Sequence, residues 1–218
     1  MVALTPPEDT PSIVPRPFNR IRPSQGGPLS WTRSEPPESA AEPLKSVYAR
    51  IKSHASRGRI SQVWQSVALD PGGLEALFAV REALLDDPAP LTAAQAELIA
   101  LVVSATNGCG YCVAHHGPHL ARALDDERLA RAVAMDYREA NLPARDRVLL
   151  DYAVALTCEP AERKLEDIER VREYGFDDPA IVKATEIAAY YNLMNRIVCA
   201  LGVTLEPGVE PWAFGDQR

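Results

Sequence analysis

Most of this chain has apolar residues at helical spacing, interrupted by short breaks. From about residue 44 onward, apolar side chains recur every three or four positions, as on one face of an amphipathic helix. Short clusters rich in Pro, Gly, Asp and Asn separate the periodic segments. No stretch alternates apolar and polar residues over the length of a strand. The sequence therefore predicts an all-α fold.

The breaks set the expected bounds of the individual helices. We expect three early helices at 44–55, 59–69 and 71–86, the last of which opens after Asp70. Thr92 and Gln95 have the spacing of a capping box, which predicts a helix that runs to a stop at Asn107–Gly108. Another helix begins near Cys109. Four later periodic segments complete the pattern: DERLARAVAM, ARDRVLLDYAVALT, KLEDIERVREYG and IVKATEIAAYYNLMNRIVCALG.

The first 43 residues differ from the rest because they hold ten of the 19 prolines. Proline removes backbone donors and favours extended or irregular chain. We therefore divide the sequence into a Pro-rich N-terminal arm or tail (1–43) and a helical domain (44–218). The first segment is either a disordered tail or an arm that packs on a neighbouring subunit. A few large apolar residues, Phe18 and Trp31 among them, favour the packed arm.

Composition excludes several classes of function. The net charge of −7 and the pI near 5.2 argue against binding to nucleic acid or to an anionic membrane surface, which requires a basic face. No apolar run approaches the ~18 residues of a membrane helix. The N-terminus has no basic and apolar signal pattern, so we expect a cytoplasmic protein. In that compartment a close cysteine pair is more often catalytic or metal-binding than structural.

The stretch NGCGYCVAHHG, residues 107–117, concentrates the reactive side chains. Cys109 and Cys112 lie three residues apart at the start of a helix, so their side chains share one face within disulfide reach. The positive end of the helix favours a thiolate and lowers a cysteine pKa below about 8.5. Such a thiolate can attack a peroxide oxygen to form a sulfenic acid, which the second cysteine converts to a disulfide.

Two further residues have the chemistry to move the proton. His116 lies one helical turn after Cys112, so its imidazole and that thiol can meet. His115 competes for the same role, whereas His119 lies a turn further away. Glu97 belongs to the nearly all-apolar segment AELIALVVSA, where burial would raise its pKa and make it a proton acceptor near neutral pH. The alternative is an exposed carboxylate in the first turn of that helix.

These residues together carry a resemblance to a known family. The pattern resembles the Glu-x11-Cys-x2-Cys-x3-His signature of the alkylhydroperoxidase D-like proteins. Here it consists of Glu97, Cys109-Gly-Tyr-Cys112 after eleven residues, and His116 after three more. The alkylhydroperoxidase D-like proteins belong to the wider carboxymuconolactone decarboxylase-like family. The segments REALLDDPAPLTAAQAELIALVVSATNGCGYC and YYNLMNRIVCALGV are similar to its peroxidase-related branch. The resemblance covers roughly residues 44–205 and implies a helical bundle.

The resemblance also implies roles. Cys112 would attack the peroxide, and Cys109 would form the disulfide and receive the external thiol reductant. Glu97 and His116 would relay the proton through water. The implied protein is a cofactor-free, antioxidant hydroperoxidase or disulfide reductase, assembled as a trimer or as a hexamer built from dimers. Where the family's hydroperoxidases carry a histidine before the second cysteine, this chain has Tyr111, and a phenol is a poor base at neutral pH.

Other interpretations of the same residues stay open. Cys109, Cys112 and His116, with His115 or Glu97 as a fourth ligand, are acceptable zinc ligands. The pair can also sense oxidants without turnover, and lactone decarboxylation occurs elsewhere in the wider family. Covalent haem is disfavoured because its motif has a histidine directly after the second cysteine, and a thioredoxin-like site is disfavoured because it needs strands. Cys158 and Cys199 are expected to be small, buried helix residues.

Overall fold

The computed structural model describes residues 27–55 and 58–212. No β-strand occurs within these residues, which confirms the prediction of an all-α fold. They form nine α-helices, one π-helical turn and one 3-10 turn: α1 (Leu44–His54), α2 (Gln62–Ser66), α3 (Pro71–Arg81), η1 (Glu82–Asp86), α4 (Ala93–Thr106), α5 (Gly110–Leu124), α6 (Glu127–Asp136), α7 (Ala144–Cys158), η2 (Pro160–Glu162), α8 (Leu165–Glu173) and α9 (Asp178–Leu201).

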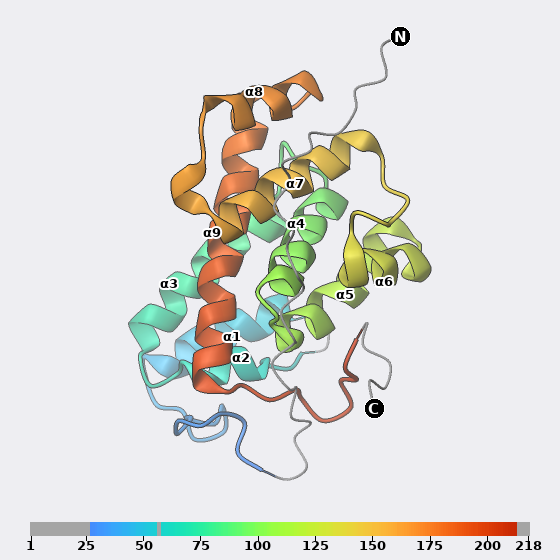
Figure 1. Ribbon diagram of the computed structural model, residues 1–218. Helices are drawn as coiled ribbons and strands as arrows, with labels where there is room; N and C mark the ends of the chain where they lie inside the picture. Colours follow the sequence, from blue (N-terminus) through green and yellow to red (C-terminus); the bar gives the residue numbers. More distant parts are fainter. Residues whose placement is uncertain (1–26, 56–57, 213–218) are drawn as a thin grey trace.

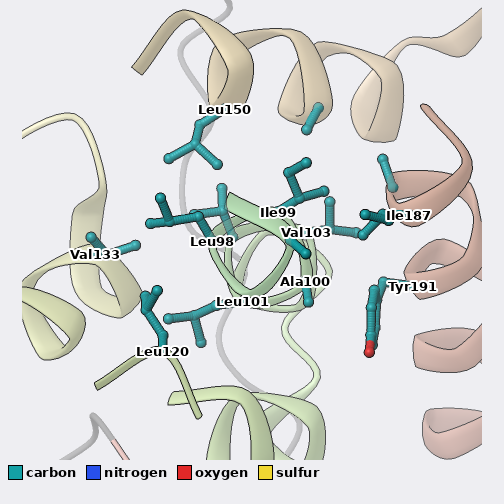
Figure 2. Packing of buried hydrophobic residues seen from close by; sticks show 14 of the residues in the cluster. Leu98, Ile99, Ala100, Leu101, Val103, Leu120, Val133, Leu150, Ile187 and Tyr191 are labelled. Carbon is teal, nitrogen blue, oxygen red and sulfur yellow. The ribbon is translucent and has the colours of Figure 1, made fainter. Parts of the chain in front are cut away.

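Helix α4 runs through the centre of the bundle and packs against α5, α6, α7 and α9 (Figure 1). Its sequence is apolar around most of its circumference, and such a helix is stable only when other helices cover every side. Figure 2 shows its side chains pointing toward the surrounding helices, where they meet Leu120 of α5, Val133 of α6, Leu150 of α7 and Ile187 of α9. Full burial stabilises each such side chain by about 1.5–3 kcal/mol.

Local signals place most helix ends where the sequence predicted them. Thr92 and Gln95 form the predicted capping box, with both reciprocal hydrogen bonds at 3.1 Å. The Asp70 side chain accepts from the Gly73 N–H at 3.1 Å and caps α3. Two predicted helices differ from the structure. The helix expected at 59–69 is only α2, and the one expected at 71–86 changes to a π-helical turn after Arg81.

The described part of the Pro-rich segment begins at residue 27 and runs beside the end of α9. The Trp31 N–H donates to the Leu201 carbonyl at 2.8 Å, and the Thr204 N–H donates to the Leu29 carbonyl at 2.9 Å. Gly202 ends α9 with φ of 61°, and the Trp31 ring packs so closely on it that a Cβ there would clash. Residues 1–26, with Phe18, lie outside the described residues, and the boundary at residue 43 stays a prediction.

No helix in the part of the chain that the structure describes is both long and apolar enough to cross a membrane.

Candidate active site

The cysteine pair lies at a sharp reversal between α4 and α5. Gly108 adopts a positive φ of 68°, which L side chains rarely tolerate. Around it, the Gly108 N–H donates to the Ala105 carbonyl at 3.0 Å and the Cys109 N–H to the Ser104 carbonyl at 2.9 Å. This pattern closes α4 as a Schellman-type cap. Cys109 is also the residue that starts α5, so the break predicted from Asn107–Gly108 sets the position of the first thiol.

The two sulfurs lie in direct contact. Cys109 Sγ donates to Cys112 Sγ at 3.0 Å, and the residues are only 1% and 5% exposed. The hydrogen bond to Cys112, together with burial, raises the pKa of the Cys109 thiol well above its usual range. The expectation that the helix start lowers a cysteine pKa is therefore wrong for Cys109, because its proton is held by the second sulfur.

Glu97 on α4 faces two histidines of α5. Its Oε2 lies 2.8 Å from His116 Nδ1, and its Oε1 lies 3.5 Å from His119 Nδ1. Burial alone would raise the pKa of Glu97, but the charges and hydrogen bonds of the two histidines lower it to about 2. The predicted raised pKa is wrong, because the residues that bury the carboxylate are also its partners. Glu97 is therefore ionised at neutral pH.

His116 is held as a neutral imidazole. Its burial lowers its pKa below 6.5 and outweighs the opposing effect of Glu97. With Nδ1–H donated to the carboxylate, Nε2 carries the lone pair that can accept a proton. The ring of Tyr191 packs edge-on against the imidazole, with centroids 4.5 Å apart. Among the described residues, His116 is hydrogen-bonded to Glu97, and Cys112 is hydrogen-bonded to Cys109. A proton that passes from Cys112 to His116 therefore requires a bridging water.

Tyr111 occupies the position at which the family's hydroperoxidases carry a histidine, and here it serves as an anchor. Its hydroxyl donates to Glu206 Oε1 at 2.7 Å and accepts from the Val63 N–H at 3.2 Å. Burial, followed by the charge of Glu206, raises the pKa of Tyr111 well above 10. His115 also turns away from the cysteines, since its Nε2 lies 2.9 Å from Glu206 Oε2.

Glu206 is the functional-site neighbour that the sequence analysis missed. It lies in the segment after α9, and it also accepts from the Gln62 N–H at 2.7 Å. Burial would raise its pKa, but the hydrogen bond and charge of His115, with the other donors, lower it to about 2. No motif marks this glutamate, and 95 residues separate it from Tyr111, so only the fold reveals the contact.

A polar network joins the cysteine turn to α9. Asn107 Nδ2 donates to Asn192 Oδ1 at 3.1 Å and to Asn195 Oδ1 at 2.9 Å, and Asn195 Nδ2 donates to Ser104 Oγ at 3.1 Å. These bonds hold the end of α4 against the last helix. Asn192 and Asn195, and Tyr191 through His116, thus bring α9 against the site.

A possible metal-ligand cluster differs from the one expected. Within the described residues, Glu97, His116 and His119 place one ligand atom each within 4.8 Å of one another. The cysteines are not part of this group. A divalent cation there would replace the Glu97–His116 hydrogen bond. The predicted burial of the remaining cysteines is also wrong, since Cys158 is exposed and Cys199 only partly buried.

Comparison with known proteins supports this description. Residues 71–138 match the model of the Carboxymuconolactone decarboxylase family, and a search of curated proteins returns no match. A peroxidase-related protein with an alkylhydroperoxidase AhpD core from Ralstonia eutropha JMP134 has a TM-score of 0.77 and 27% identity, over 86% of this chain and 97% of its own. Another peroxidase-related protein, from Silicibacter sp. TM1040, has a TM-score of 0.76 and 27% identity, over 90% and 100%.

A third solved structure shows the fold alone. It is the debrominase Bmp8 in complex with 2,3,4-tribromopyrrole, with a TM-score of 0.67 and 18% identity, over 83% of this chain and 92% of its own. The fold and the site together define a helical protein with a Cys-x-x-Cys pair beside a carboxylate–histidine pair. The family match at residues 71–138 contains Glu97, both cysteines and His116, and the fold is similar to that of the two peroxidase-related proteins.

Proposed function

We propose that the protein is a thiol-dependent peroxidase that reduces hydroperoxides with Cys112 and Cys109. The observation that carries the proposal is the 3.0 Å contact between the two sulfurs, in which Cys109 donates to Cys112. Cys112 accepts in this contact, and this favours Cys112 as the attacking sulfur. It also places the second thiol where a disulfide forms after little movement. The peroxidase-related proteins of the same fold support this assignment.

The first step consumes the hydroperoxide. His116 Nε2 takes the thiol proton of Cys112 through a water molecule, while ionised Glu97 holds the opposite nitrogen. The Cys112 thiolate attacks the hydroxyl oxygen of the hydroperoxide, and the O–O bond breaks. The sulfur becomes a sulfenic acid. The departing alkoxide takes the proton back from the His116 imidazolium and leaves as an alcohol.

The second step forms the disulfide. Cys109 loses its proton and attacks the Cys112 sulfur, and the sulfenic hydroxyl leaves with that proton as water. One hydroperoxide and two thiols have then given one alcohol, one water and one disulfide. An external thiol reductant supplies the two electrons that restore both thiols. The role of Glu97 in this scheme is to orient and stabilise His116, in place of the proton acceptor that the sequence suggested.

One titration of thiols tests the proposal. Reduced protein receives one equivalent of cumene hydroperoxide, and free thiols are counted with and without the Cys112→Ser substitution. We expect the loss of two thiols per chain in the wild type and none from this pair in the variant. The mechanism is wrong if Cys109 and Cys112 are not oxidised together, or if Cys112→Ser consumes hydroperoxide at the wild-type rate.

A redox sensor is the second candidate, because both sulfurs are buried and burial slows reduction by external thiols. A sensor and an enzyme form the same disulfide but differ in turnover. Steady-state hydroperoxide consumption with a panel of thiol and dithiol reductants separates them. Catalytic turnover supports the enzyme, whereas a single oxidation without turnover supports the sensor.

Assembly and location complete the proposal. We expect a homo-oligomer, either a trimer or a hexamer built from dimers, in the cytoplasm. Large apolar side chains exposed on α9 and near α3 support self-association: Leu69, Val80, Val182 and Leu193. Light scattering coupled to size-exclusion chromatography measures the mass of the assembly, and a monomer would contradict the expectation.

A further inference from the structure

A third cysteine lies beside the redox pair. Cys199 is on α9, one helical turn after Asn195 and therefore on the same face. The Asn195 side chain binds Asn107 at 2.9 Å and Ser104 at 3.1 Å, and the Ser104 carbonyl accepts from the Cys109 N–H. Hydrogen bonds thus hold this face of α9 against the turn that contains Cys109. Cys199 packs against the apolar core that includes both Cys109 and Cys112.

Both of the other thiols interact with Cys109. Cys109 donates its hydrogen bond to Cys112, which raises the pKa of Cys109, and a hydrogen bond from Cys199 acts in the opposite direction. Because Cys199 also packs against the core that holds Cys109, its thiol lies near that of Cys109. Two neighbouring thiols can form a disulfide when a shift brings their sulfurs into bonding geometry.

The three cysteines differ in solvent exposure. Cys109 and Cys112 are buried, whereas Cys199 is partly exposed. A disulfide between the two buried cysteines offers little surface to an external thiol, which must approach one sulfur along the S–S axis. A disulfide that includes Cys199 has one sulfur nearer the solvent.

We propose that Cys199 is a third redox cysteine, which accepts the disulfide from Cys112 and presents it to the external reductant. The proposal rests on the proposed function for the origin of the first disulfide. The Cys199 thiolate attacks the Cys109 sulfur, a Cys109–Cys199 bond forms, and the Cys109–Cys112 bond breaks. Cys112 leaves as a thiolate and takes up the proton that Cys199 lost, so the exchange needs no further oxidant or reductant. Reduction of the new disulfide by a thiol completes the cycle.

Peptide mapping distinguishes the two disulfides. Trypsin leaves Cys109 and Cys112 on the peptide 82–122, Cys158 on 148–163 and Cys199 on 197–218. A Cys109–Cys112 bond therefore stays within one peptide, whereas a Cys109–Cys199 bond links two. After one equivalent of cumene hydroperoxide and an acid quench with alkylation, we expect mass spectrometry of the wild type to find both products. An internal disulfide in 82–122 without the linked pair overturns the proposal and leaves the proposed function standing.

A second measurement does not depend on peroxide chemistry. The Cys112→Ser variant is oxidised with diamide, a general thiol oxidant, and mapped in the same way. We expect the linkage of 82–122 to 197–218. Its absence overturns the proposal even if the wild type reduces hydroperoxides. If hydroperoxide leaves the wild-type thiols reduced but diamide links Cys109 to Cys199, the proposed function fails while the contact between these two cysteines is supported.

The reduction step supplies the kinetic test. Oxidised protein is mixed with glutathione, and the return of free thiols is followed for the wild type, Cys199→Ser and Cys158→Ser. We expect Cys199→Ser to be reduced about tenfold more slowly, because the reductant must then attack a buried sulfur. Cys158→Ser is the matched control and should follow the wild type. Equal rates for all three proteins contradict the proposed role of Cys199.

Discussion

His116 Nδ1 lies 2.8 Å from Glu97 Oε2, and this hydrogen bond joins an ionised carboxylate to a neutral imidazole inside the bundle. The pKa of Glu97 is lowered to about 2, and that of His116 is lowered below 6.5 by burial. A charged acid that holds a neutral histidine leaves Nε2 as the basic atom. This is the arrangement that a base near a nucleophilic thiol requires.

Replacing Glu97 tests that arrangement. In Glu97→Gln the amide can still accept from His116 but carries no charge, so the imidazolium that forms in the reaction is less stable. We expect the rate of Cys112 oxidation by hydroperoxide to fall about 10–100-fold. Stopped-flow measurement of thiol loss gives the rate, with the exposed Glu139→Gln as the matched control. A rate within twofold of the wild type would remove Glu97 from the relay.

The protonation of His116 can be followed directly. Burial lowers its pKa below 6.5, so the neutral form persists in the fold at a pH where an exposed histidine is half charged. We expect its proton NMR titration to have a midpoint below 6.5. The midpoint should fall further in Glu97→Gln, because the carboxylate opposes the effect of burial. A midpoint above 6.5 in the wild type would contradict the neutral imidazole.

The two cysteines should give different products when replaced singly. In Cys109→Ser, Cys112 can still be oxidised but has lost its disulfide partner, so we expect a sulfenic acid that dimedone labels on the peptide 82–122. Cys112→Ser should give no such label. Cys158→Ser should form the disulfide as the wild type does. Labelling of Cys109 in Cys112→Ser would reverse the assigned roles.

Tyr111→Phe tests the role of the tyrosine as an anchor. The substitution removes the donor to Glu206 and the acceptor for the Val63 N–H while the ring stays in place. Because these partners are largely buried, we expect the free energy of unfolding to fall by about 1–3 kcal/mol in urea titrations. Tyr174→Phe, at the end of α8, is the matched control. If Tyr111→Phe keeps its stability but stops oxidising Cys112, the hydroxyl acts in the chemistry.

Glu206 should make the free energy of unfolding depend on pH. Its pKa falls from 4.5 to about 2 on folding, so its contribution is present above pH 4.5 and is lost as the pH drops toward 2. We expect the stability of the wild type to decline across that window and that of Glu206→Gln to decline less. Chemical denaturation at several pH values measures both. The exposed Glu210→Gln, four residues away, should behave as the wild type.

Much of the site's framework could be predicted because it depends on neighbours in sequence. The capping box of Thr92 and Gln95 and the stop at Asn107–Gly108 are interactions over a few residues, and the structure has both. The same applies to the Cys109–Cys112 spacing, which one helical turn converts into a sulfur contact. The helix expected at 59–69 was too long because its ends depend on packing rather than on a cap.

The all-helical fold, the turn that places the thiols and the identity of the groups near them follow from the amino-acid order along the chain. The charge on those groups and their distant partners depend on how the helices pack. Glu97 is buried, as its apolar helix indicated, yet its pKa is lowered because two histidines of α5 face it. Tyr111 meets Glu206, and Cys109 lies near Cys199, because the fold brings α9 and the segment after it against the start of α5. The protonation of a buried group depends on what packs across from it, and that is a property of the folded chain.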